Sequence, residues 1–157
     1  IEPNPIIYKR LKKNFKLLES QNKFIKKNFI LKNFAIGDNE SLGKIDKTID
    51  HANVKIIKGK RSKIEENYIE IKIAKLSSLL KKCKVKNISC IKIDTEGYEY
   101  KILKDFFKKV NLKYFPKFLI IEHNNDKNYY KNERIILKNK YEIKFTTNSN
   151  NIYKRNV

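Results

Sequence analysis

Two short apolar segments, each followed directly by an acidic residue, place the strongest constraint on the fold. Residues 88–93 (ISCIKI) run into Asp94, and residues 118–121 (FLII) run into Glu122. Between them, apolar residues at helical spacing predict an amphipathic helix over 102–110. A strand, a helix and a second strand in this order form a unit whose two strands pair in parallel. The sequence therefore predicts an α/β fold.

The rest of the chain continues this alternation. The further predicted elements are a helix over 6–20, a strand over 29–36, strand candidates over 53–57 and 68–73, a helix over 128–139 and an antiparallel pair over 141–147 and 151–155. Ser77 or Ser78 is expected to cap a short helix. The continuous apolar run 118–121 is typical of a strand buried on both faces. The 157 residues suit one domain with a mostly parallel sheet and an antiparallel strand at its C-terminal end.

The formal net charge of +20 makes a polyanionic partner an obvious first hypothesis. However, 33 of the 37 basic residues are Lys, whereas evolved nucleic-acid surfaces favour Arg for its bidentate contacts. Lys is also spread almost evenly along the chain, so compositional bias on solvated faces is the favoured explanation. A nucleic-acid-binding α/β module stays open as the alternative, with Tyr129, Tyr130 and Lys131 as its best local candidates.

The two cysteines, Cys83 and Cys90, have no metal-binding spacing. So few cysteines favour a reducing compartment, the cytoplasm, and two buried thiols. No apolar run approaches the roughly 20 residues of a membrane span. The chain contains no Met and begins at Ile1, so we expect that an N-terminal part is missing.

Acidic side chains are scarce and gather where predicted strands end. Asp94, Glu96 and Glu99 follow one strand, and Glu122 and His123 follow the next. Carboxyl ends of parallel strands meet at one edge of a sheet, where ligands bind. Carboxylates there can hold ribose hydroxyls, and a carboxylate or His can take a hydroxyl proton. Each position also has a structural explanation: Asp94 and Glu99 as helix N-caps or partners of the helix dipole, His123 as a structural residue, and backbone freedom at Gly97.

Several motifs together resemble the FkbM family of S-adenosylmethionine-dependent methyltransferases. They cover nearly the whole chain in order and are IEPNP at 1–5, Leu11 and Asn14, NFAIGD at 33–38, IKIDTEGYE at 91–99 and IIEH at 120–123. The segment IKIDTEGYE with the Ile102-Leu103-Lys104 that follows is the most specific part. The resemblance implies a Rossmann-like class I methyltransferase sheet and transfer of a methyl group to a hydroxyl oxygen of a sugar or secondary metabolite.

The resemblance also implies roles for single residues. Those on the cofactor side are Glu2 and Asn4 in the first motif, Ala35, Ile36 and Asp38 in the second, and Asp94, Glu96 and Gly97 in the third. Asp94, Glu122 and His123 are the implied catalytic residues, facing a small-molecule or glycan acceptor. We expect acceptor specificity to lie in residues 39–73. Asp94, Glu96 and Glu122 have the oxygen ligands that a hard cation needs. A site that works by hydrogen bonds, without a metal, is the favoured alternative.

The sequence departs from the family pattern in two respects. The first strand, the first helix and the glycine-rich loop that holds the methionine part of the cofactor are absent, and none of the four Gly form GxG. Leu76-Ser77-Ser78 stands where the family often has Leu-Asp. We therefore expect residues 1–157 to be a methyltransferase domain that is incomplete at its N-terminus and binds the cofactor poorly. A non-catalytic relative is a further alternative.

Overall fold

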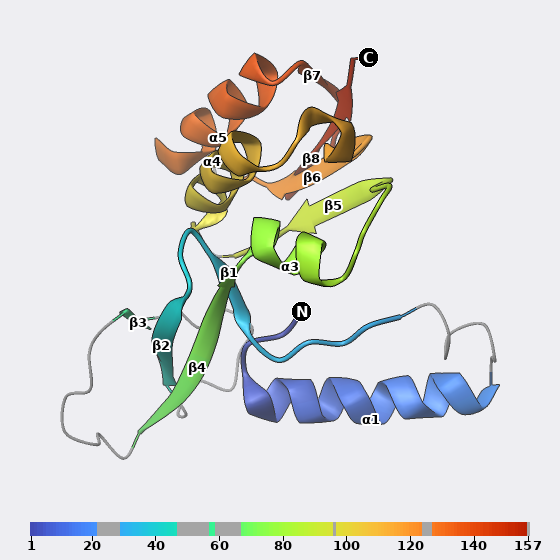
Figure 1. Ribbon diagram of the computed structural model, residues 1–157, viewed down its shortest axis with the longest axis vertical. Helices are drawn as coiled ribbons and strands as arrows, with labels where there is room; N and C mark the ends of the chain where they lie inside the picture. The colour runs from blue at the N-terminus through green and yellow to red at the C-terminus, as the bar shows by residue number, and fades with distance from the viewer. Residues whose placement is uncertain (22–28, 47–56, 59–66, 96, 124–126, 157) are drawn as a thin grey trace. The chain divides into compact units, whose positions relative to one another are not determined.

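The computed structural model describes residues 1–21, 29–46, 57–58, 67–95, 97–123 and 127–156. These residues form an α/β structure with two four-stranded sheets. The chain divides into two compact units, residues 1–74 and 75–157, and each is described by itself (Figure 1). In the described part, no helix is long and apolar enough to cross a membrane.

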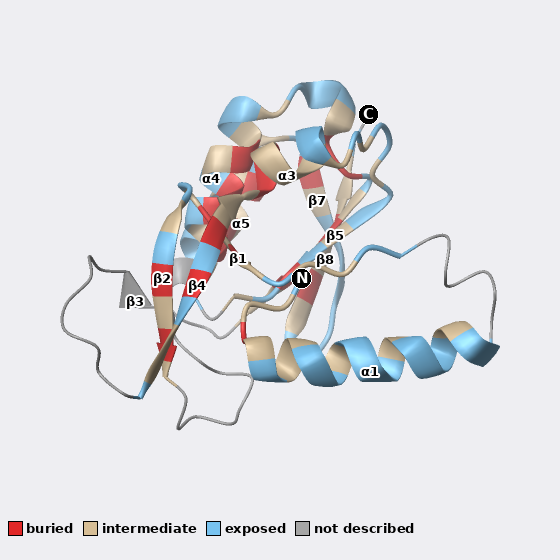
Figure 2. Cartoon of the chain, turned by 60° about the horizontal axis from the view of Figure 1, so that its bottom comes forward, coloured by how far each residue is buried: buried red, intermediate tan, exposed pale blue. Residues whose placement is uncertain are grey.

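The first unit holds one helix and a small sheet. Its elements are α1 (Pro5–Gln21), β1 (Ala35–Gly37), β2 (Ser41–Asp46), β3 (Ile57–Lys58) and β4 (Tyr68–Lys75), with the strand order β1-β4-β2-β3. Strand β2 pairs antiparallel with both β3 and β4. Side chains alternate between the two faces of a strand, and Figure 2 shows buried and exposed residues alternating along β4. The buried cluster consists of Ala35, Ile45, Ile71 and Ile73.

One strand prediction in this unit was partly wrong, and one strand of the structure was not predicted. The strand predicted over 29–36 is reduced to β1, because the preceding residues contact the start of the chain instead of a sheet. The Lys32 carbonyl accepts a bond from the Glu2 N–H (3.0 Å), and the Leu31 carbonyl accepts one from the Tyr8 hydroxyl (3.3 Å). Strand β2 was not predicted, because its short apolar positions lie among polar residues. The candidate over 53–57 falls outside the described residues except at Ile57.

The second unit follows the predicted order closely. Its elements are α3 (Leu76–Lys82), β5 (Cys90–Ile93), α4 (Glu99–Lys109), the 3₁₀ turn η1 (Leu112–Tyr114), β6 (Phe118–Glu122), α5 (Lys127–Lys138), β7 (Tyr141–Thr146) and β8 (Asn150–Arg155). The strand order is β5-β6-β8-β7. Strands β5 and β6 pair in parallel, and β8 lies antiparallel between β6 and β7. The parallel pair and the C-terminal antiparallel strand are therefore confirmed. The prediction of a mostly parallel sheet was wrong, because two of the three strand pairs in this sheet are antiparallel and β2 in the first unit also pairs antiparallel with its neighbours.

One face of this second sheet is buried by apolar side chains. Ile93, Leu119 and Ile121 point to this face together with Tyr153, and all four are almost fully buried. Burial raises the pKa of Tyr153 to about 12. The opposite face carries Ile120 and other side chains that are only half-buried or exposed. The prediction that 118–121 is buried on both faces was therefore wrong among the described residues.

Two smaller predictions in this unit also failed. Helix α3 begins at Leu76 with Lys75 at its N-cap position, and no side chain caps it. Ser77 lies inside the helix, where its hydroxyl donates to Asp105 Oδ2 at 3.1 Å. Cys83 is half-buried and Cys90 is exposed, because Cys90 begins strand β5 on the face that carries Ile120. The expectation of two buried thiols was wrong.

Candidate functional site

The first motif, residues 2–4, forms a tight polar start to helix α1. The Asn4 side chain caps the helix, because its Oδ1 accepts from the N–H groups of Ile6 (2.9 Å) and Ile7 (3.4 Å). Glu2 Oε1 accepts from the Asn4 N–H at 2.7 Å. Asn4 is 6% exposed and Glu2 is half-buried. The Asn4 side chain thus serves to cap the helix. The Glu2 carboxylate is oriented by its bond to the Asn4 N–H.

Asn33 ties the second motif to the first. Its side-chain Nδ2 donates to the carbonyls of Glu2 (2.8 Å) and Pro3 (3.0 Å). Strand β1 follows at once, and Asp38 lies directly after it, half-buried. Glu2 and the segment that leads into Asp38 are therefore joined within the first unit.

The side chains of β1 differ in what they can offer a ligand. Ala35 is 2% exposed and packs in the apolar cluster of the first unit. Ile36 points the other way and is half-buried. Among the residues of this motif, Ile36 and Asp38 therefore remain accessible to a ligand, whereas Ala35 serves the core.

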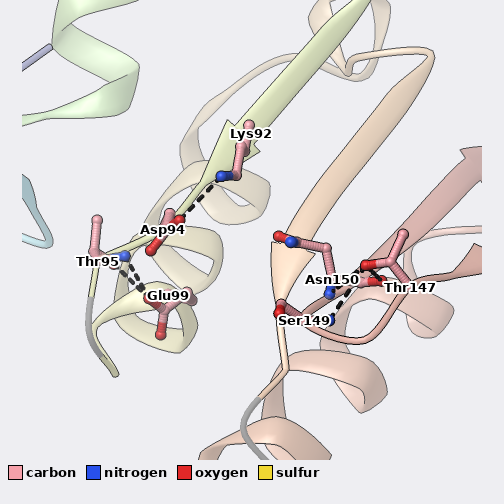
Figure 3. A network of polar contacts seen from close by, with 7 residues as sticks. All are labelled: Lys92, Asp94, Thr95, Glu99, Thr147, Ser149 and Asn150. Carbon is pink, nitrogen blue, oxygen red and sulfur yellow. Dashed lines mark hydrogen bonds and ion pairs between the residues drawn. The ribbon is translucent and has the colours of Figure 1, made fainter.

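The loop after β5 is organised around the Glu99 carboxylate. Glu99 Oε1 accepts from the Thr95 N–H (2.7 Å), the Thr95 hydroxyl (2.9 Å) and the Gly97 N–H (3.3 Å). Glu99 is 4% exposed and stands in the first turn of α4 (Figure 3). Gly97 has a φ of 91°, which favours glycine. Glu99 and Gly97 therefore shape the loop. Glu99 lies in the first turn of α4, as a dipole partner would, but it does not cap the helix, because the N-cap residue is Tyr98 and it has no side-chain cap bond. Glu96 lies outside the described residues.

Asp94 stands at the exposed start of this loop. Its Oδ2 forms an ion pair with Lys92 Nζ at 3.0 Å (Figure 3). Residues two apart on a strand share a face, so this contact places Asp94 on the less buried face of the second sheet. Asp94 is thus exposed, directly before Thr95, whose N–H and hydroxyl are bound by Glu99.

The end of β6 is held against the β7–β8 turn. The His123 N–H donates to the Ser149 carbonyl at 3.0 Å, and His123 Nε2 lies 3.0 Å from the Thr147 carbonyl oxygen. A carbonyl only accepts, so Nε2 is the donor in this contact. The Tyr129 ring packs edge-on against the His123 ring, with centroids 5.8 Å apart. His123 therefore also has a packing task.

Strand register places three polar residues in one row across the second sheet. Ile93 pairs with Ile121, so Asp94 lies level with Glu122, one residue further along both parallel strands. Glu122 in turn pairs with Asn150, the first residue of β8. Neighbouring strands lie about 4.8 Å apart, so the row spans roughly 10 Å with Glu122 in its middle. The structure thus brings Asp94 and Glu122 together on one face, at the carboxyl ends of β5 and β6.

Sequence reasoning missed Asn150 in this row. It was read as a turn residue, because Asn148-Ser149-Asn150 carries a turn composition. The sequence could have indicated Asn150 only indirectly: a strand that pairs antiparallel with β6 begins at the edge of the sheet where β6 ends.

The metal and nucleic-acid alternatives can be compared only with the described parts of the chain, which do not include Glu96. No group of three or more His, Cys, Asp or Glu there can hold a metal ion. The local nucleic-acid candidate does not form one aromatic platform. Tyr130 is exposed, whereas the Tyr129 hydroxyl contacts Glu133 Oε1 (3.4 Å) and Asn151 Nδ2 (3.0 Å).

Comparison with protein families assigns the chain. Residues 1–143 match the family model described as the methyltransferase FkbM domain. Comparison with curated proteins and with solved structures gives no match. The matched range includes the N-terminal motif, the Glu99-centred loop and the strand that ends at Glu122, so the resemblance found in the sequence is confirmed. The chain belongs to the FkbM family of methyltransferases.

Proposed function

We propose that this chain transfers a methyl group from S-adenosylmethionine to a hydroxyl oxygen of a glycan or another polyhydroxylated small molecule. The observation that carries the proposal is that Asp94 and Glu122 lie side by side at the carboxyl ends of the parallel strands β5 and β6, with Asn150 at the start of antiparallel β8 in the same row, in a methyltransferase of this family. Ligands of open α/β sheets bind at this edge. Two carboxylates and an amide are groups that bind and orient hydroxyls.

The residues on the cofactor side suit the nucleoside part of S-adenosylmethionine. Ribose hydroxyls are donors and need acceptors. Glu2 and Asp38 are carboxylates at the two ends of the hydrogen-bonded segments that Asn33 joins in the first unit. Ile36 supplies an apolar surface for the adenine. When bound, the cofactor supplies the methyl group, whose bond to sulfur breaks as its bond to the acceptor oxygen forms.

Within the acceptor row we propose Glu122 as the base. The acceptor hydroxyl loses its proton to the Glu122 carboxylate as the new oxygen–carbon bond forms. Asp94 orients the same hydroxyl from the neighbouring strand. His123 closes the edge of the site next to Glu122, because its Nε2 is committed to the Thr147 carbonyl.

The cofactor assignment can be tested by titration. In the described part, β5 pairs with a strand on one edge only, and residues 1–157 contain no glycine-rich loop for the methionine part of the cofactor. Isothermal titration of residues 1–157 with S-adenosylmethionine should therefore detect only weak binding, with a Kd above the micromolar range. Micromolar binding by residues 1–157 would show that Glu2, Asp38 and Asp94 suffice.

The reaction itself can be tested with simple acceptors. Full-length protein is incubated with methyl-labelled S-adenosylmethionine and a panel of methyl glycosides, and labelled product is counted. We expect label in at least one glycoside, at an oxygen. Label at nitrogen or carbon, or no label in any member of the panel, contradicts the proposal. Binding of RNA or DNA with a steep salt dependence, without methyl transfer, would support the nucleic-acid alternative.

A further inference from the structure

Helix α1 differs from the other two long helices in how little of it is buried. In the described part of the chain, none of its 17 residues is buried (Figure 2), whereas α4 and α5 bury apolar side chains such as Leu103 and Ile136. The apolar residues of α1 nevertheless recur at helical spacing along one side: Ile7, Leu11, Phe15 and Leu18. An amphipathic helix normally buries this side in its own protein, so α1 keeps much of it available for a partner.

Two exposed residues before β1 enlarge the apolar side of α1. The Phe29 ring packs edge-on against the Phe15 ring, with centroids 5.2 Å apart. Phe29 is 54% exposed, and its neighbour Ile30 is 65% exposed. We define the apolar α1 surface as Phe15, Leu18, Phe29 and Ile30. Large apolar side chains that gather at an exposed position mark an interaction site.

Basic side chains border the apolar α1 surface. Helix α1 carries one acidic residue, Glu19, and five basic ones: Lys9, Arg10, Lys12, Lys13 and Lys16. Lys12 Nζ lies 5.9 Å from the centroid of the Tyr8 ring, and the Tyr8 hydroxyl donates to the carbonyl of Leu31, next to Ile30. Lys16 follows Lys12 one turn later on the same flank of the helix. The exposed apolar side chains therefore have cations along their edge.

The combination of apolar and basic side chains favours a lipid surface over a nucleic acid. The phosphates of a nucleic acid pair with lysines, but they leave aliphatic side chains such as Leu18 and Ile30 without a partner. In a bilayer with anionic headgroups, acyl chains cover the apolar side chains and the headgroups attract the lysines. Compositional bias toward Lys accounts for cations on every helix, but it does not account for exposed Leu, Ile and Phe beside them.

We propose that α1 and the segment around Phe29 dock the protein on the surface of a bilayer that contains anionic phospholipids. Helix α1 lies in the plane of the bilayer, with Leu18, Phe29 and Ile30 at the boundary between headgroups and acyl chains. Lys12 and Lys16 lie among the headgroups. The inference goes beyond the proposed function and uses no residue of the acceptor row, so either can fail without the other.

Cosedimentation with vesicles tests the electrostatic part of the docking. Full-length protein is mixed with vesicles of phosphatidylcholine, or of equal parts phosphatidylcholine and phosphatidylglycerol. Affinity for the mixed vesicles should be about 10-fold higher or more, and it should fall as salt is added. The double variant Lys12→Gln, Lys16→Gln should bind them about 10- to 30-fold more weakly. The same changes at Lys131 and Lys138 of α5 are the matched control and should cost less than about threefold.

Leu18→Gln tests the apolar part. Leu18 is 47% exposed and Leu137 on α5 is 46% exposed, so Leu137→Gln is its matched control. Leu18→Gln should weaken binding to mixed vesicles about 10-fold and Leu137→Gln less than about twofold. Circular dichroism checks that each variant is folded. If Leu18→Gln is not, Ile30→Gln takes its place, because Ile30 is the more exposed.

Three results would overturn the inference. The first is no preference for mixed vesicles, which includes the case that another part of the full-length protein covers α1. The second is an equal loss of binding in Leu18→Gln and Leu137→Gln. The third is binding to duplex DNA as tight as binding to mixed vesicles, with both unchanged in Leu18→Gln, because such a surface recognises any polyanion and not a lipid.

Discussion

Glu122→Gln should lower kcat for methyl transfer by about 10²- to 10⁴-fold in the full-length protein, the range typical of removing a general base. Gln keeps the shape of Glu and its ability to accept hydrogen bonds, but it takes up no proton from the acceptor. Glu122 stands in the middle of the row, between Asp94 and Asn150 on the two adjacent strands. Affinity for S-adenosylmethionine should stay within about threefold, because the proton transfer concerns the acceptor alone.

Glu142→Gln is the matched control for this experiment. Glu142 lies on β7, level with Lys154 and Phe118, so it occupies the same face of the sheet at the opposite end of β6. The side-chain bond to Lys144 lowers the pKa of Glu142, so this carboxylate is charged at neutral pH. Its replacement should change kcat by less than about twofold. If Glu122→Gln keeps more than a tenth of wild-type kcat, the base is another residue, and Asp94 is the next to test.

The order of elements in the second unit could be predicted because each element carries its own periodic signal. The helical stripe over 102–110, the apolar run at 118–121 and the alternation over 141–155 are local patterns. Strand β2 carried no such signal, since its pairing with β4 depends on residues almost 30 positions away. The strand expected over 29–36 has the right composition, but the Leu31 and Lys32 carbonyls accept bonds from Tyr8 and Glu2.

In the candidate site, too, local sequence patterns could be recognised, whereas contacts between distant residues could not. Asp94 and Glu122 could be found because an acidic residue directly after an apolar strand is visible in the sequence. Their level placement, and the addition of Asn150, depend on the register of three strands. Asn4 was assigned to the cofactor through the family motif, yet its side chain is used in capping α1. A motif identifies the segment that matters, but hydrogen bonds decide which of its side chains can reach a ligand.

Glu99→Ala should lower the free energy of unfolding by about 2–4 kcal/mol and remove most methyl transfer activity. The variant leaves the N–H groups of Thr95 and Gly97 and the Thr95 hydroxyl, all in part-buried contacts, without the carboxylate that now holds them, and bonds to a charged group are worth more than neutral ones. Glu99→Gln keeps one accepting oxygen and should lose about 1 kcal/mol. Urea unfolding followed by circular dichroism measures both variants.

Glu70→Ala is the control for Glu99→Ala, because Glu70 is exposed on β4 and should change stability by less than about 0.5 kcal/mol. The loop that Glu99 holds begins at Asp94, so the loss of activity should exceed the fraction of unfolded protein at the assay temperature. Activity that merely follows the folded fraction would mean that the loop geometry does not matter for transfer. A kcat that falls in folded Glu99→Gln, with unchanged affinity for S-adenosylmethionine, would show that the buried carboxylate acts by positioning the acceptor side of the site.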